Sequence, residues 1–175
     1  MRLPNGSRTT FLAALFIVGS VVSFGVTADA APSTWTVQTT PNPNGAAYNY
    51  LSGVSCVSAT ACSAVGNYDL SSGGTKTLAE RWNGTDWAVK YTPNPTGATT
   101  SYLNGLSCTS ATACTAVGYY HPSSGGTKTL VERRNGANWA VTTTPNPTGN
   151  SYLSGVSCAS ATACTAVGHY SGSGG

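Results

Sequence analysis

The chain has 175 residues, enough for one ordinary domain, and only 7% of them are charged, with a formal net charge of +3. The few lysines and arginines form no basic stripe, so the composition gives no indication of a nucleic-acid partner. Threonine, serine, glycine, asparagine, tyrosine and valine dominate the rest. This composition is typical of short strands and tight turns, and we therefore expect an all-β protein.

The beginning of the chain has the pattern of a secretory signal peptide. Two arginines give a positive start, an apolar run follows at 11–26, and Ala-Asp-Ala at 28–30 supplies the small residues that signal peptidase recognises. The apolar run is shorter than the ~20 residues of a membrane-spanning helix, which favours a cleaved leader over a membrane anchor. We predict a signal peptide at 1–30 and a secreted, extracellular repeat domain at 31–175, with no membrane partner after cleavage.

An internal repeat of about 50 residues organises the rest of the chain. Trp35, Trp87 and Trp139 are spaced by 52 residues, and 15 of 17 positions are identical between 50–66 and 152–168. Such close copies must adopt the same local structure. The copies span 35–43, which holds only the last strand of a unit, 50–95, 102–147, and 152–175, which is truncated.

Each complete unit is predicted to contain four short strands. Alternation with a period of two is clearest in the last strand, where Trp87, Val89 and Tyr91 point to one side. An Asn-Gly pair predicts the turn before this strand, and prolines end it because proline cannot donate a ladder hydrogen bond. In the first complete copy the predicted strands are 50–56, 61–68, 76–82 and 87–93.

A unit of about 50 residues with four antiparallel strands matches one blade of a β-propeller. The chain holds eleven predicted strands, about 2.75 units, whereas propellers usually need about four to eight blades to close. Three interpretations remain open. The chain is part of a longer propeller, or it closes a ring as a homo-oligomer in which two chains give six blades, or its three units form a β-trefoil.

Two short segments carry a family resemblance. NGTDW at 83–87 and NGANW at 135–139 resemble the end of the Asp-box of sialidase-type propellers, in which a glycine precedes an aromatic residue by three positions. The serine and aspartate of that box are absent here. Over residues 35–170 the whole unit resembles the Cys-containing, propeller-like repeats of secreted bacterial proteins, with Asp-box or kelch-like blades. The resemblance implies a propeller-type fold. It indicates little about function, because most of these proteins lack an assigned activity.

All six cysteines occur in pairs with five residues between them, one pair in each unit. In a secreted chain, regular pairs favour disulfides, and this spacing suits a bridge across the hairpin that joins the first two strands. Zinc needs four converging ligands and redox centres typically have C-x-x-C spacing, so we predict neither a metal nor another cofactor. The predicted disulfides are Cys56–Cys62, Cys108–Cys114 and Cys158–Cys164.

The carboxylates do not suggest a catalytic site. Glu80 and Glu132 are equivalent by repeat, whereas a glycosidase needs two carboxylates in different environments. We expect each glutamate to pair with the adjacent Arg81 or Arg133, or to face water. No catalytic residue is predicted, and a non-enzymatic protein is the leading hypothesis. The alternatives are a fragment of a secreted propeller glycoside hydrolase or sialidase-like enzyme, and a purely structural or nonfunctional copy.

The copies differ most just after the second strand of each unit, at the start of the following loop. Loops on a rigid scaffold commonly carry binding, and tyrosine offers a flat apolar ring with a polar tip. We therefore predict that an extracellular glycan or protein binds this face through repeated weak sites, which together give avidity. The alternative is that the rings only cover the tops of the blades. The candidate binding residues are Tyr68, Asp69, Tyr119, Tyr120, His121, His169 and Tyr170.

Overall fold

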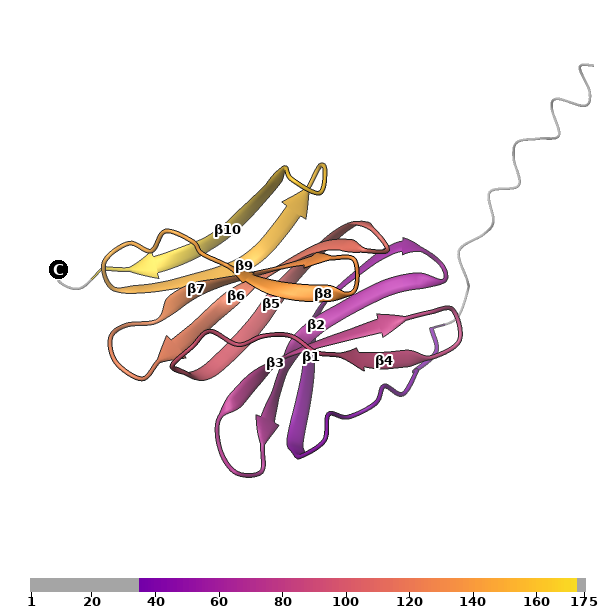
Figure 1. Ribbon diagram of the computed structural model, residues 1–175, viewed down its shortest axis with the longest axis horizontal. Coiled ribbons are helices and arrows are strands. Elements are labelled where there is room, and N and C mark those ends of the chain that lie inside the picture. The colour runs from indigo at the N-terminus through magenta and orange to yellow at the C-terminus, as the bar shows by residue number, and fades with distance from the viewer. Residues whose placement is uncertain (1–34, 173–175) are drawn as a thin grey trace, which may run out of the picture. The chain divides into compact units, whose positions relative to one another are not determined.

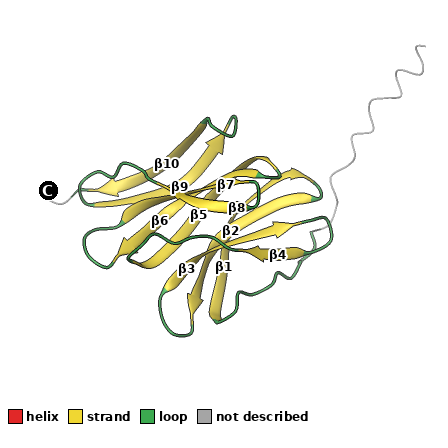
Figure 2. Cartoon of the chain, viewed as in Figure 1, coloured by secondary structure: helices red, strands yellow, loops and turns green. Residues whose placement is uncertain are grey.

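The computed structural model describes residues 35–172, so the predicted signal peptide lies outside the described residues. The described part of the chain is all-β, without a helix, as Figures 1 and 2 show. All ten strands belong to one compact domain, Thr39–Gly175. The strands are β1 (Ala46–Ser58), β2 (Ala61–Leu70), β3 (Thr75–Trp82), β4 (Trp87–Lys90), β5 (Ala98–Ser110), β6 (Ala113–Pro122), β7 (Lys128–Asn135), β8 (Asn138–Thr142), β9 (Asn150–Cys158) and β10 (Cys164–Ser171).

The strands form two antiparallel meanders and one hairpin. We call β1–β4 unit one, β5–β8 unit two and β9–β10 unit three, since within each group consecutive strands pair. One parallel pair, Thr75 with Thr100, joins units one and two into a single eight-stranded sheet that does not close on itself. The all-β prediction is confirmed at this level. The finer propeller and trefoil arrangements stay predictions.

A strand is predicted within residues 35–43, but these residues form none. In both complete units the fourth strand pairs only with the third strand of its own unit, β4 with β3 and β8 with β7. No strand precedes this segment among the described residues, so it has no ladder to join. The predicted number of eleven strands is therefore wrong by one.

The fourth strand of unit one is shorter than predicted, because it ends at Lys90. Beyond it, side chains take over the pairing with β3. Thr92 Oγ1 lies 2.9 Å from Thr77 Oγ1, and Asn94 Oδ1 accepts a hydrogen bond from Thr77 N at 3.2 Å. The prolines of this segment cannot donate to a ladder, so polar side chains attach it to the sheet. The equivalent amide bond of unit two measures 2.7 Å.

In every unit a disulfide links the two strands of the first hairpin close to its turn. The three pairings that the spacing predicts are all present: Cys56–Cys62, Cys108–Cys114 and Cys158–Cys164. Farther from the turn, a bulge between Leu103 and Gly105 brings the Tyr102 carbonyl against Gly118. A Cβ on Gly118 would lie 1.9 Å from that oxygen, so only glycine fits. Gly66 and Gly168 meet the same obstacle in the other two units.

The hydrophobic core lies between units one and two. Unit one contributes Val65 and Ala79. From unit two come Leu103, Cys114, Ala116, Leu130 and Trp139. The first strands β1, β5 and β9 are neighbours in contact, so the three units pack side by side, as can be followed in Figure 1. Small side chains on the first two strands permit this close approach.

Candidate functional site

Five aromatic rings meet at one end of β5, β6, β9 and β10. Tyr102 stacks on Tyr119 with ring centroids 4.8 Å apart, and Tyr119 meets Tyr152 edge-on at 4.9 Å. Tyr152 stacks in turn on His169 at 4.8 Å, and His121 makes an edge contact with Tyr119 at 5.6 Å. We call these five residues the aromatic cluster. The cluster crosses from unit two into unit three.

Strand register explains how the cluster forms. Tyr102 lies directly opposite Tyr119, and Tyr152 lies directly opposite His169. Side chains at directly opposite positions project from the same face of a sheet and interact. In unit one the residue opposite Tyr50 is an asparagine, so this unit has no equivalent ring pair.

A threonine forms the polar centre of the cluster. Thr127 Oγ1 lies 3.1 Å from His121 Nδ1 and 3.3 Å from Tyr152 Oη, and Thr127 N donates to Asn150 Oδ1 at 2.7 Å. Burial, followed by the hydroxyls of its two tyrosine neighbours, raises the pKa of Tyr119. This hydroxyl therefore stays protonated at neutral pH, and it is available as a hydrogen-bond donor as well as an acceptor.

The structure places the predicted binding residues within strands rather than on loops. The second strands run on to Leu70, Pro122 and Ser171, beyond the predicted strand ends. The expectation that loops carry these residues is therefore wrong, because all seven of them lie within β2, β6 and β10. Their role in binding stays a prediction.

Only three of the predicted residues, Tyr119, His121 and His169, belong to the aromatic cluster. Tyr120 points to the other side and packs against the hydrophobic core. Tyr68 lines a separate groove of unit one, together with residues of β3 and β4.

The two remaining predicted residues lie apart from the cluster contacts. Tyr170 is 64% exposed. Asp69 accepts a hydrogen bond from Thr75 Oγ1 at 2.7 Å, the unit-one counterpart of the contact between His121 and Thr127.

The cluster also contains residues outside the predicted set. Tyr102 and Tyr152 are not among the predicted candidates, and Thr127 and Asn150 are likewise found only through the structure. The disulfide fixes the register only as far as the bulge, where a shift of one residue brings Tyr102 opposite Tyr119 and Tyr152 opposite His169, so the cysteine spacing alone does not predict these ring pairs.

The two repeated glutamates are buried rather than exposed. Glu80 is 1% exposed and Glu132 is 0% exposed. The expected pairing with Arg81 or Arg133 is wrong, because adjacent residues of a strand point to opposite faces. Burial raises the pKa of Glu132 to about 8, with the nearby Thr77 hydroxyl acting in the opposite direction, and burial also raises the pKa of Glu80. A carboxyl group without exposed surface cannot reach a substrate in this conformation.

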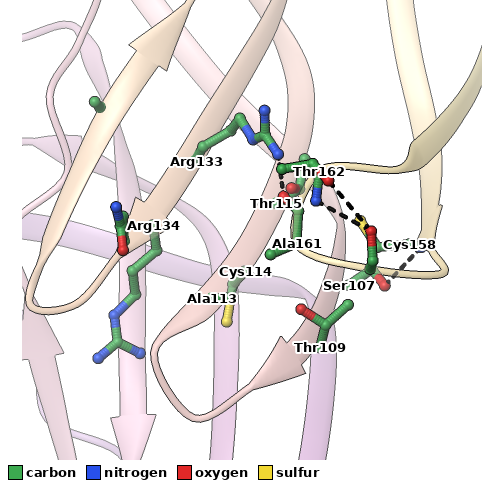
Figure 3. A pocket seen from close by; sticks show the side chains of 13 residues that line it. Ser107, Thr109, Ala113, Cys114, Thr115, Arg133, Arg134, Cys158, Ala161 and Thr162 are labelled. Carbon is green, nitrogen blue, oxygen red and sulfur yellow. Dashed lines mark hydrogen bonds between the residues drawn. The ribbon is translucent and has the colours of Figure 1, made fainter.

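A cavity of about 390 Å³ lies beside the disulfides between units two and three. Ser107 Oγ accepts a hydrogen bond from Cys158 N at 3.1 Å there, and the Arg133 guanidinium donates to the carbonyl of Ala161. In Figure 3, Arg133 reaches toward the Ala161 loop while Arg134 points away from it. The polar groups of this cavity therefore join the two units, and we assign the cavity a structural role.

Comparisons with protein-family models, with curated proteins and with solved structures each return no match to this chain. Within residues 35–172 no helix is long and apolar enough to cross a membrane. The same part of the chain contains no group of three or more His, Cys, Asp or Glu side chains arranged to hold a metal ion. The three disulfides are consistent with an extracellular protein. Functional inference therefore depends on the geometry of the aromatic cluster.

Proposed function

We propose that the protein is a secreted, non-enzymatic repeat module that binds a neutral extracellular glycan at the aromatic cluster. The observation that carries this proposal is the continuity of five rings across two units. A pyranose ring has an apolar C–H face bordered by hydroxyls, and an aromatic side chain with a polar tip complements both. Asn150 and Thr127 add polar groups beside the rings.

The low charge of the chain favours a neutral ligand over an anionic one. Only 7% of residues are charged, and the aromatic cluster contains no carboxylate, lysine or arginine. The cluster also lies on strands rather than on a mobile loop, and a rigid scaffold lowers the entropic cost of binding. These features suit repeated sugar units better than a charged protein surface.

We further propose that the units are blades of a propeller-type scaffold. Each complete unit is a four-stranded antiparallel meander, and the first strands of all three units are neighbours. This arrangement supports blades around a common axis, and it places the aromatic cluster at one end of the inner strands. Hydrolysis has less support, because Glu132 is 0% exposed and Glu80 is 1% exposed.

Retention on insoluble polysaccharides tests the binding proposal. The secreted chain is incubated with chitin, cellulose and bacterial cell walls, and the bound fraction is measured against protein concentration. Replacing an aromatic contact costs up to about tenfold in affinity, so His169→Ala and Tyr152→Ala should each weaken retention by about that factor. Tyr91→Ala is the matched control, since this tyrosine is 84% exposed and lies outside the cluster.

Two results would overturn the proposal. The first is that none of the polysaccharides retains the folded chain. The second is that retention occurs but is the same for the two cluster variants as for the control, because binding would then lie elsewhere on the molecule.

A further inference from the structure

The two interfaces between units repeat the same hydrogen bond. Cys108 N donates to Ser55 Oγ at 3.0 Å between units one and two, and Cys158 N donates to Ser107 Oγ at 3.1 Å between units two and three. Each interface therefore has an acceptor side on the earlier unit and a donor side on the later one. The acceptor side of unit three and the donor side of unit one are the two outer faces of the stack.

Backbones approach closely at a glycine in both interfaces. A Cβ on Gly53 would lie 3.3 Å from the carbonyl oxygen of Asn104, and a Cβ on Gly105 would lie 3.0 Å from the Cα of Gly155. Gly155 is the equivalent residue of unit three, and a Cβ there would meet only a side chain of its own unit, at 3.6 Å. The space that a further unit fills elsewhere is open at Gly155.

The outer faces expose the apolar side chains that the inner interfaces bury. Val65 and Val117 are both 0% exposed, whereas their equivalent in unit three, Val167, is 64% exposed. On the opposite side, Leu103 is 0% exposed and its equivalent in unit one, Leu51, is 42% exposed. Exposed apolar surface of this kind marks interaction sites on soluble proteins.

The two outer faces are complementary because the copies are nearly identical. Unit three docks on unit two through the donor side of β9, and 15 of 17 positions agree between 152–168 and 50–66. Unit one therefore carries the donor side that fits such a surface. The acceptor side matches as well, since the six residues 113–118 of unit two recur as 163–168 in unit three.

We propose that the acceptor face of unit three binds the donor face of unit one from a second copy of the chain, head to tail. Ser157 Oγ accepts a hydrogen bond from Cys56 N of the second copy, and Val167 packs against Leu51 of the second copy. The contact between Tyr119 and Tyr152 is repeated by His169 and Tyr50 of the second copy, which is 53% exposed in the single chain. The aromatic cluster thereby extends across the new interface.

A head-to-tail contact joins two different surfaces, so a ring forms when the rotation between copies closes and a longer assembly forms when it does not. Two copies that make the contact twice give a closed ring of six units. This inference is independent of the glycan proposal, because it depends only on how the units pack.

Complementation between two variants provides the test, with mass measured by sedimentation equilibrium on the secreted chain with its disulfides intact. Val167→Asp blocks the acceptor face and Val54→Asp blocks the donor face, and both valines are 64% exposed, so neither change disturbs a buried core. We expect the unmodified chain to form dimers or longer assemblies. Each variant alone should dissociate at least about 100-fold more readily, because its interface would bury an unpaired charge.

An equal mixture of the two variants retains one intact face of each kind, so dimers should reappear in the mixture. Val141→Asp is the control, since this valine is 41% exposed on β8 and should leave the assembly unchanged. The proposal is overturned if the unmodified chain is monomeric throughout the concentration range. It is equally overturned if either variant associates like the unmodified chain, or if the mixture stays monomeric.

Discussion

The buried carboxyl group of Glu132 makes the stability of this protein depend on pH. Glu132 lies on β7 and is 0% exposed, and neither of its carboxyl oxygens has a hydrogen-bond partner of good geometry. The neighbouring cation on the same face of β7 is Arg134, whose own pKa is lowered by burial and by Arg81. Without an ion pair to compensate for lost solvation, the neutral acid is the preferred form in the folded state.

The size of this pH dependence follows from the pKa values of Glu132 in the unfolded and folded states. Burial raises the pKa of Glu132 from 4.5 to about 8, so between these values the folded state holds a proton that the unfolded state has released. The stabilisation by the neutral acid is complete below about pH 4.5 and is lost as the pH rises to about 8, at about 1.4 kcal/mol per pH unit. The full loss is on the order of 5 kcal/mol, comparable to the whole stability of many domains.

Urea unfolding at pH 5, 6.5 and 8 measures this dependence, with the disulfides intact and the urea slope checked for constancy. Glu132→Gln keeps the size of the side chain and removes its titration, so the variant should lose most of the fall in stability between pH 5 and pH 8. Asp86→Asn, at an exposed position in the turn after β3, should keep the fall of the unmodified chain. Equal pH dependence in the unmodified chain and Glu132→Gln would refute the reasoning.

The remaining predictions concern the glycines and the disulfides. Gly105→Ala should lower the free energy of unfolding by about 1–3 kcal/mol, because its Cβ meets backbone, while Gly172→Ala, whose Cβ meets no atom within 4 Å, should change it by less than about 0.5 kcal/mol in urea titrations. Gly118→Ala should fail to give the native far-UV circular dichroism spectrum, since a carbonyl oxygen occupies the Cβ position. Replacing Cys108 and Cys114 together by alanine should cost about 2 kcal/mol, the value for a short closed loop, and an unchanged urea midpoint would contradict this.

The secondary structure was predictable wherever the sequence repeats. The four-strand pattern and the hairpin disulfides follow from period-two alternation and from regular cysteine spacing, and both require only local information. The segment at 35–43 shows the limit of this approach. Its sequence is that of a fourth strand, but a strand needs a partner, and pairing is a property of the surrounding chain.

The buried glutamates were predictable in principle. In β7, Leu130 and Glu132 are two residues apart and therefore share a face, and the leucine indicates that this face is buried. Carboxylates are rarely buried, which favours an exposed orientation for Glu132. In a strand, however, the alternation of the backbone determines which face a side chain occupies. The aromatic cluster was harder to predict, because Tyr119 and Tyr152 belong to different units and meet only through packing.

The repeat restrains the two ends of each hairpin differently, and this difference supports the proposed position of the binding site. At the disulfide end, Cys108 N and Ser55 Oγ bond across units, so each copy must present the same atoms to its neighbours on both sides. At the other end, the residue opposite the tyrosine is Asn67, Tyr119 or His169, according to the unit. These three side chains differ in size and polarity, and an asparagine cannot make the ring contact that Tyr119 makes with Tyr152 of unit three. We therefore expect a ligand that distinguishes one unit from another to contact this end of the hairpins, where the structure places the aromatic cluster.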